Sequence, residues 1–226
     1  MGQLLTPSTL AIGMSRLPDR SIGLLGRDDC IPSVYIGDAD VAASADLIRA
    51  TGWQAKMFDS LEALADGPRT PIPSCLVFDI SRHSPGELAL HERLRALRPE
   101  MPIICTTKNV DLAVVVSIMK AGAFDVLGKP IVGNLLLDTI HRALQRSEVA
   151  LKEEFETRRI RDRYESLSNR ERQVMSLIVS GLLNKQVGGE LGISEITVKA
   201  HRGRLMLKMQ ARSFASLVKM AAALNL

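Results

Sequence analysis

The sequence has few of the features that mark enzymes, metalloproteins or membrane proteins. Its 226 residues include three cysteines, Cys30, Cys75 and Cys105, and their spacing matches no metal-ligand pattern. No apolar run is as long as the roughly eighteen residues that a membrane-spanning helix requires. The chain also shows no basic leader followed by an apolar stretch and a cleavage signal. We therefore predict a cytoplasmic protein with no membrane partner.

The three cysteines differ in their surroundings. Cys75 and Cys105 lie in apolar, strand-like runs, which predicts small core residues. Cys30 lies outside such a run and could be exposed. A redox-sensing thiol is the alternative interpretation.

The net charge of +4 is unevenly distributed along the chain. Residues 1–149 contain 15 Lys and Arg against 17 Asp and Glu, a net charge of −2; the remaining residues contain 14 against 8, a net charge of +6. A basic surplus is typical of surfaces that contact phosphates. The C-terminal part of the chain is therefore the part that we expect to meet nucleic acid.

Short apolar runs and amphipathic segments alternate from Ser33 onward. Five strands alternating with five helices call for a parallel sheet with right-handed crossovers, and we expect a doubly wound, flavodoxin-like domain. The expected strands are Val34–Ile36, Ala55–Phe58, Cys75–Phe78, Pro102–Cys105 and Asp125–Leu127. The expected helices are Val41–Ala50, Ser60–Ala65, Glu87–Leu97, Asp111–Ala121 and a last one from about Gly133.

Polar residues follow the expected strands at the point where each strand ends. Asp38 follows the first strand, Asp79 the third, Thr106 and Thr107 the fourth, and Lys129 the fifth. In such sheets the functional groups lie beyond the carboxyl ends of the strands. This constellation resembles the receiver domain of two-component response regulators.

The resemblance implies a role for each of these positions. Asp79 matches the phospho-accepting aspartate, Thr107 the hydroxyl that follows the phosphoryl group, and Lys129 the ammonium that pairs with it. A carboxylate can attack a phosphoryl donor when a divalent cation screens the charge, so the resemblance implies a Mg²⁺ site at Asp38 and Asp79. The motifs that match the FixJ branch are Met119-Lys120-Ala121-Gly122-Ala123-x-Asp125 and Lys129-Pro130, whose peptide bond is typically cis in receivers.

The receiver-like pocket departs from the family pattern. Ala39 replaces an acidic residue that is expected to bind Mg²⁺ directly, and Asp40 is displaced along the chain. Loss of a carboxylate weakens binding, because Mg²⁺ requires near-octahedral oxygen ligation. Lys108 replaces a small residue, and its ammonium could neutralise Asp79 without phosphorylation. Val126 replaces the switch aromatic. These departures place the phosphorylation of Asp79 in doubt.

The segment from Asn184 to Met209 has the pattern of two short helices joined by a tight turn. Gly192 can take the left-handed conformation that ends the first helix, and Ser194 can cap the second, which we expect to begin at Glu195. Helical periodicity places Val198, Leu205 and Met209 toward the core. The opposite side carries Ile196, Ala200, Gly203 and Leu207, flanked by Lys199 and Arg204.

The outward side of this second helix has a small, flat centre and basic edges. These features suit close approach to base edges in the major groove of DNA, while the long cations reach guanine or phosphate. An amphipathic surface helix with a solvated basic face is the alternative interpretation. A capping box at Ser168 and Glu171 opens an earlier scaffold helix, and a final amphipathic helix follows the pair.

Motifs in this C-terminal part resemble the LuxR-type helix-turn-helix, in particular that of the NarL/FixJ family of response regulators. They are Leu167-Ser168-x-Arg170-Glu171-Arg172-Gln173-Val174-Met175, Gly181-Leu182-x-Asn184-Lys185, Ile193-Ser194-x-x-Thr197-Val198-Lys199-x-His201-Arg202 and Lys208-Met209. The resemblance, together with the basic outward face, assigns DNA contacts to Lys185, Thr197, Lys199, Ala200, Arg202, Gly203 and Arg204. For His201 we favour a structural hydrogen bond over a base contact.

The resemblance also implies a homodimer on double-stranded DNA. In this family the final helix commonly forms the dimer contact. Two reading helices related by a two-fold axis fit successive major grooves, which predicts an inverted-repeat operator. The residues that we assign to the dimer contact are Leu217, Lys219, Met220, Ala221 and Ala222.

We divide the chain into four segments. The linker contains the i,i+4 pair Glu154–Arg158 and a narrow apolar stripe of Leu151 and Phe155, so it is either a solvated helix or a short dimerising coil. The boundaries are 1–32 for a poorly ordered extension, 33–147 for the receiver-like domain, 148–165 for the helical linker and 166–226 for a four-helix DNA-binding domain.

The leading interpretation is a sequence-specific transcriptional regulator of the response-regulator type, whose receiver controls dimerisation and DNA binding. Its partner would be a sensor histidine kinase or another regulatory protein. The alternative is a phosphorylation-independent regulator whose receiver binds a protein or a ligand and thereby gates DNA binding. We do not expect an enzyme, because beyond the aspartyl site no nucleophile–base pair, phosphate-binding glycine loop or metal cluster is present.

Overall fold

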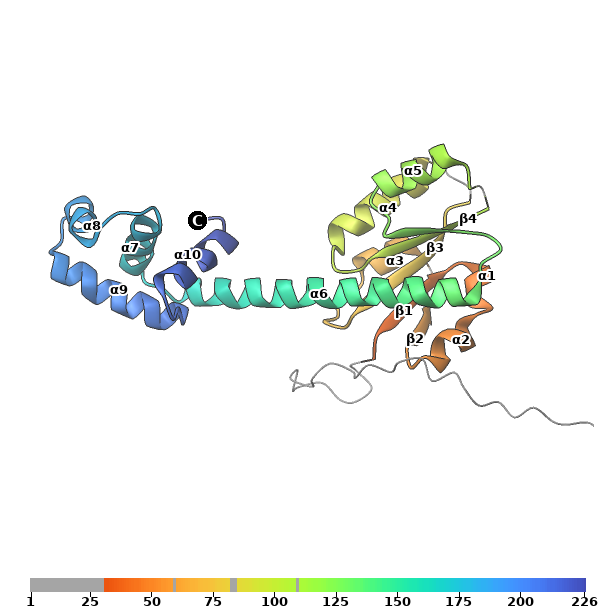
Figure 1. The fold of residues 1–226 in the computed structure, drawn as a ribbon, viewed down its shortest axis with the longest axis horizontal. Helices are drawn as coiled ribbons and strands as arrows, with labels where there is room; N and C mark the ends of the chain where they lie inside the picture. Colours follow the sequence, from red (N-terminus) through yellow and green to blue (C-terminus); the bar gives the residue numbers. More distant parts are fainter. Residues whose placement is uncertain (1–30, 59, 82–84, 109) are drawn as a thin grey trace, which may run out of the picture. The chain divides into compact units, whose positions relative to one another are not determined.

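The predicted parallel sheet is present in the computed structural model, which describes residues 31–58, 60–81, 85–108 and 110–226. Neighbouring strands pair in parallel in the order β2-β1-β3-β4-β5, which confirms the flavodoxin-like fold class (Figure 1). The strands are β1 (Ser33–Gly37), β2 (Gln54–Met57), β3 (Ser74–Asp79), β4 (Ile103–Thr107) and β5 (Asp125–Gly128). Most of the extension predicted at residues 1–32 lies outside the described residues.

Helices cover both faces of this sheet, and successive strand residues point to opposite faces. One face packs against α1 (Ala39–Ala42), α2 (Ala45–Ala50) and the first part of α6 (Gly133–Glu165). The other face packs against α3 (Leu61–Asp66), α4 (Pro85–Leu97) and α5 (Leu112–Lys120). The doubly wound arrangement therefore gives the domain two cores, one on each side of the sheet.

The two cysteines predicted to lie in the core are both fully buried, one on each side of the sheet. Cys75 belongs to the core beneath α6, and Cys105 to the core beneath α3 and α4. Burial raises the pKa of Cys105 to about 12 and raises the pKa of Cys75 still further. Both thiols are therefore protonated at neutral pH. Cys30 lies outside the described residues.

The helix expected over Val41–Ala50 is wrong in its extent, because the chain forms two short helices instead. The first begins earlier because a carboxylate oxygen of Asp38 accepts hydrogen bonds from the amides of Asp40 and Val41, at 2.7 and 3.3 Å. Nothing in the structure explains the interruption at Ala43 and Ser44.

Helix α6 runs without a break from Gly133 to Glu165. Its first half buries Leu136, Ile140 and Ala143 against the sheet, and near its end Ile160 and Tyr164 join the C-terminal core. One helix thus supplies side chains to one core of the sheet domain and to the core of the C-terminal helices. None of the described helices is both long and apolar enough to cross a membrane.

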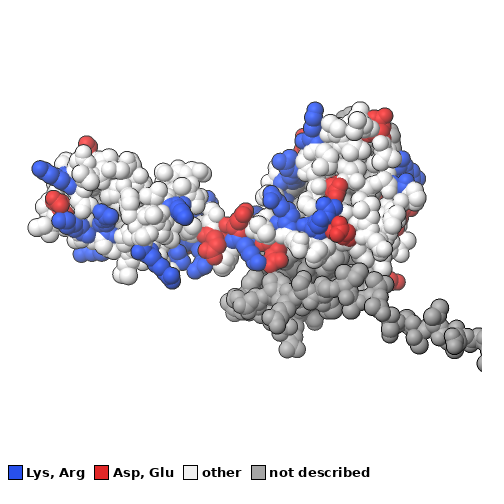
Figure 2. All heavy atoms as spheres, viewed as in Figure 1, with Lys and Arg blue, Asp and Glu red and all other residues white. Residues whose placement is uncertain are grey.

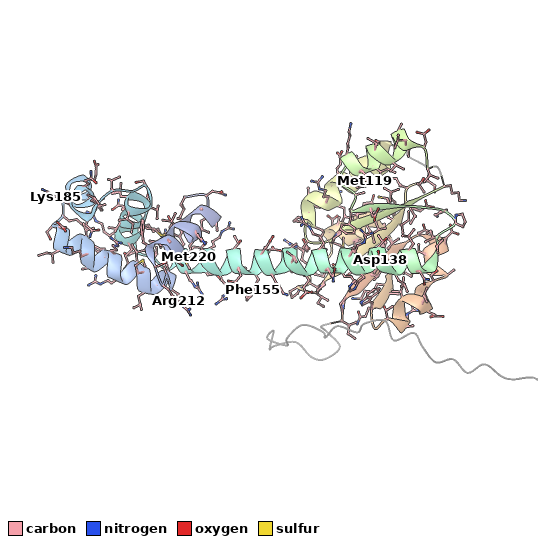
Figure 3. The ribbon with its side chains drawn as sticks, viewed as in Figure 1. Met119, Asp138, Phe155, Lys185, Arg212 and Met220 are labelled. Atoms are coloured by element: carbon pink, nitrogen blue, oxygen red, sulfur yellow. The ribbon has the colours of Figure 1, made fainter. Side chains whose placement is uncertain are left out.

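The expected Glu154–Arg158 pair on α6 is wrong. Glu154 instead accepts a hydrogen bond from Arg69 at 2.7 Å, and the same guanidinium binds the buried carboxylate of Glu100 at 2.8 and 3.1 Å. A guanidinium already oriented by a second carboxylate is a better partner than a solvated arginine one turn away. Phe155 of the predicted stripe lies on α6 with 61% of its surface exposed (Figure 3).

Four helices follow α6 and pack around a core of their own. They are α7 (Asn169–Val179), α8 (Asn184–Leu191), α9 (Glu195–Met209) and α10 (Phe214–Ala223). The predicted inward residues Val198, Leu205 and Met209 are fully buried, which confirms the helical periodicity. The predicted outward residues Ile196, Ala200, Gly203 and Leu207 are exposed.

The local signals that begin and end these helices are also confirmed. The Ser168 hydroxyl accepts from the amide of Glu171 at 3.3 Å, and the Glu171 carboxylate accepts from the amide of Ser168 at 2.8 Å. Gly192 is left-handed with φ of +64°, and the Ser194 hydroxyl accepts from the amide of Thr197 at 3.1 Å. Helix α9 therefore starts at the predicted residue, Glu195.

Two adjacent glycines of α8 provide a matched pair of stability predictions. A Cβ at Gly188 would lie 2.8 Å from the carbonyl oxygen of Ile193, so we expect Gly188→Ala to destabilise the protein by about 1–3 kcal/mol. A Cβ at Gly189 meets no atom within 4 Å, so Gly189→Ala should stabilise it by about 0.5–1 kcal/mol through helix propensity. Urea unfolding followed by circular dichroism measures both, and shifts of the same sign would contradict the packing argument.

Candidate functional site

The strand ends bring three predicted residues together at one edge of the sheet. Asp38 follows β1, Asp79 ends β3 and Lys129 follows β5, whose Lys129–Pro130 peptide bond is cis as the resemblance implies. The ammonium nitrogen of Lys129 lies 2.9 Å from an oxygen of Asp38, 2.9 Å from Asp40 and 2.8 Å from Asp79. One cation therefore contacts three carboxylates.

Asp38 is fully committed to contacts within the protein. It is 1% exposed, and its Oδ1 caps α1 through the two backbone amides described above. Its Oδ2 accepts from Lys129 and from the hydroxyl of Thr106. Thr106 is thus a pocket residue that the resemblance, which points to Thr107, did not identify. The position of Thr106 among the polar residues at the end of the fourth strand is the sequence feature that points to it.

Asp79 is half-buried, with one third of its side chain exposed. Its Oδ2 accepts from Lys129, and its Oδ1 accepts from both the amide and the hydroxyl of Ser81. Burial alone would raise the pKa of Asp79, but these hydrogen bonds outweigh it and lower the pKa. Ser81 was also missed from the sequence, although a small hydroxyl residue two positions after an aspartate favours such a turn.

Lys129 titrates in the opposite sense. Burial lowers the pKa of its ammonium, but the hydrogen bonds to Asp79, Asp40 and Asp38 raise it by more, so the pKa lies above its ordinary value. Asp79 and Lys129 thus favour the charged form of one another.

Lys108 does not take the place that we expected. Within the described part of the chain its ammonium forms no ion pair with Asp79, and Lys129 neutralises that carboxylate instead. The exposed Lys108 side chain lines the wall of a cavity of about 480 Å³, together with Asp40, Lys129 and apolar side chains. Thr107 is buried at the end of β4.

The arrangement does not fit a Mg²⁺ ion. Ala39 offers no oxygen, and both carboxylate oxygens of Asp38 already have partners. The point at which three carboxylates converge is held by the ammonium of Lys129. Over the described residues, no group of three or more His, Cys, Asp or Glu side chains is arranged to hold a metal. The residues of this pocket therefore support no chemical step that uses a metal.

The second candidate site is the outward face of α9. On the face seen in Figure 2, Lys and Arg side chains gather over the C-terminal helices, whereas both signs of charge are mixed along α6. Lys199 and Arg204 are exposed on α9, and Lys185 is exposed on α8 (Figure 3). Lys199 forms an ion pair of 3.0 Å with Glu195, one turn earlier.

Other residues predicted to contact DNA are held by neighbours. Arg202 donates to the side-chain oxygen of Asn184 at 3.2 Å and stacks over the ring of Phe214 at 5.4 Å. The Thr197 hydroxyl shares a hydrogen bond of 2.8 Å with the Ser194 hydroxyl. Arg202 is therefore better placed to fix α8 and α10 against α9 than to reach a base.

His201 is half-buried on α9. Its Nδ1 is buried and has no hydrogen-bond partner among the residues that the structure describes. The structural hydrogen bond that we favoured for His201 is therefore not seen at this atom.

The predicted dimer surface on α10 requires a correction. Leu217 and Ala221 are 0% and 2% exposed in the core of the C-terminal helices, so the folded domain cannot present them to a second copy. Met220 is half-buried (Figure 3), while Lys219 and Ala222 are exposed. Val218, at 37% exposed, lies on the solvent side and was not assigned from the sequence.

An ion pair between α7 and α9 was not predicted. The Lys208 ammonium lies 2.7 Å from the carboxylate of Glu171, which is 3% exposed and also closes the capping box. The hydrogen bond from Lys208 lowers the pKa of Glu171; burial opposes this, and the bonds with Ser168 reinforce it. The pair joins the scaffold helix to the last turn of α9.

Known regulatory proteins are similar to this chain over most of its length. Residues 165–221 match the family described as bacterial regulatory proteins, luxR family. Nodulation protein W of Bradyrhizobium diazoefficiens is 35% identical over 196 residues, which cover 85% of this chain and 86% of that protein. Transcriptional regulatory protein FixJ of the same species is 34% identical over 191 residues, covering 83% of this chain and 93% of FixJ.

The solved structure of the response regulator StyR extends the agreement to the whole fold. It is 34% identical, with a TM-score of 0.68, and the match covers 85% of this chain and 99% of that one. The chain belongs to the FixJ-like response regulators. This response regulator is accordingly a DNA-binding regulator of transcription with a LuxR-type helix-turn-helix.

The pair Lys208–Glu171 generates a prediction about pH. Because folding lowers the pKa of Glu171, the ionised carboxylate stabilises the folded response regulator above its unfolded pKa, and this contribution is lost as pH falls through the folded pKa. Glu171→Gln can keep the capping bond but removes the charge. We expect it to lower the melting temperature at pH 7, with a difference that shrinks on acidification below pH of about 4.

Thermal unfolding at several pH values measures this difference. Glu165→Gln, an exposed carboxylate at the end of α6, is the control. A loss in Glu171→Gln that stays constant from pH 7 to acid would contradict the charge argument.

Proposed function

We propose that this response regulator binds an inverted-repeat operator as a homodimer, with α9 of each copy in a major groove. The observation that carries the proposal is the outward face of α9, where a centre of small side chains lies between exposed cations. A two-fold dimer places two such helices one turn of DNA apart. An operator on chromosomal DNA also places the protein in the cytoplasm.

In this proposal the exposed cations contact different parts of the DNA. Lys199 and Arg204, on α9, reach base edges or adjacent phosphates, and Lys185 of α8 holds phosphate. Thr197, whose amide and hydroxyl are bound to Ser194, lies at the first turn of α9, and the N-terminus of this helix faces the phosphates of the DNA in this proposal. Ala200 and Gly203 allow close approach, and Arg202 holds the helices in position.

For the dimer contact we propose the solvent side of α10. Val218, Lys219 and Ala222 are exposed there, and Met220 is partly accessible. Residues 33–147 act as the receiver, 148–165 as the linker and 166–226 as the DNA-binding domain in this scheme.

For the receiver we propose control that does not depend on Mg²⁺-assisted phosphorylation of Asp79. Ala39 removes a metal ligand, and the Lys129 ammonium already neutralises the acids that would surround a metal. A regulatory protein or small ligand that binds the receiver would then set dimerisation and DNA binding. Phosphorylation of Asp79 by a sensor histidine kinase is the competing proposal.

The DNA-binding assignment is tested on DNA selected by the full-length protein from a random pool. We expect Lys185→Ala to weaken binding equally on all sequences and to reduce the slope of log Kd against log salt by about 1, as loss of one phosphate contact requires. Arg204→Ala and Lys199→Ala should cost about 1–3 kcal/mol on the selected site and relax its specificity.

Lys152→Ala on α6 is the matched control, because it removes one exposed cation that pairs with Glu148. If no sequence were enriched from the random pool, this result would contradict the proposed function. Equal losses in the control and in the α9 variants would contradict the assignment of the face.

A further inference from the structure

We infer that this response regulator distinguishes A·T pairs in its operator by contact of Ile196 and Ala200 with thymine methyl groups. The inference rests on the proposed function and names how its α9 face reads sequence. It follows from which side chains α9 exposes and from which of its polar groups already have partners.

Helix α9 lacks the side chains that usually recognise adenine. Bidentate recognition of adenine in the major groove uses Asn or Gln, and the α9 sequence, EITVKAHRGRLMLKM, contains neither. The amides of α8 are committed elsewhere. Asn184 accepts from Arg202, and the side-chain oxygen of Gln186 accepts from the amide of Leu183 at 2.8 Å.

Polar groups that α9 does expose already have partners within the protein. The Thr197 hydroxyl is shared with Ser194, and the Glu195 carboxylate is paired with Lys199. The remaining cations, Lys199 and Arg204, suit guanine or phosphate and cannot accept the hydrogen bond that the amino group of adenine donates. Among the described residues, this face therefore offers adenine no side-chain amide for a bidentate contact.

An exposed apolar strip lies between those cations on α9. Ile196 is 79% exposed and Ala200 is exposed one turn later on the same side of the helix. A Cβ added at Gly203, a further turn along, would meet nothing within 4 Å, so the space next to this strip is open at Gly203. Leu207, also 79% exposed, continues it.

Burial of the exposed Ile196 side chain against an apolar group of the DNA would lower the free energy of binding, because it removes apolar surface from water. The 5-methyl group of thymine is the only apolar group that a base pair presents in the major groove, so the strip and the methyl are complementary. Removing one buried methyl-sized group should weaken binding about fourfold. Ile196 and Ala200 are accordingly the residues that set A·T preference, while Lys199 and Arg204 set contacts with guanine and phosphate.

The test uses the selected DNA site and deoxyuridine, which differs from thymidine only in lacking the 5-methyl group. Each thymine of one half-site is replaced in turn, and the Kd of the full-length protein is measured. We expect at least one replacement to weaken binding about fourfold, and we expect Ala200→Gly or Ile196→Ala to abolish that sensitivity. Ala215→Gly, the same change at an exposed position of α10, should preserve it.

Ile196→Ala serves as the second variant because Ala favours a helix, so it remains informative if Ala200→Gly impairs folding. The inference is overturned if every deoxyuridine replacement leaves Kd unchanged on a site that is still bound specifically, and the proposed function then survives. It is also overturned if both α9 variants retain the sensitivity. Enrichment of no site at all would overturn the proposed function itself.

Discussion

The ion pairs of Lys129 are the constraint on which the receiver pocket depends. Its ammonium contacts Asp38 and Asp40, which lie where β1 leads into α1, and Asp79 at the end of β3, so one residue after β5 joins the ends of two other segments of the sheet edge. The positive charge of Lys129 offsets the mutual repulsion of the three carboxylates. The hydrogen bonds from Thr106 and Ser81 then fix the orientation of Asp38 and Asp79. The pocket is a closed set of charges rather than an open ligand sphere.

The fold and the faces of α9 could be predicted because both follow from local periodicity. Alternating strands and helices determine a parallel sheet, and a spacing of 3.6 residues determines which side of a helix is buried. The pairings of charged side chains could not be predicted in the same way. The family pattern predicts that Lys108 neutralises Asp79, and i,i+4 spacing predicts that Arg158 pairs with Glu154. Lys129 and Arg69 reach these carboxylates instead, from distant segments.

The candidate DNA surface shows the same limit. The outward side of α9 could be predicted because exposure on an amphipathic helix is a local property, whereas the burial of Leu217 and Ala221 depends on how α10 meets α7 and α9. Arg202 likewise turned inward to Asn184 and Phe214, which no spacing rule foresees. Internal partners thus explain both the closed receiver pocket and the apolar character of the α9 face.

We propose that Ala39 and the Lys129 cluster leave the receiver pocket without a site for a metal ion. The most direct test is the intact mass of the protein after incubation with a small-molecule phosphodonor and Mg²⁺, with Ala39→Asp and Asp79→Asn beside it. We predict no adduct on the unaltered protein and a single phosphoryl adduct on Ala39→Asp, whose restored carboxylate provides the missing ligand. A phosphoryl adduct on the unaltered protein that Asp79→Asn abolishes would contradict this proposal.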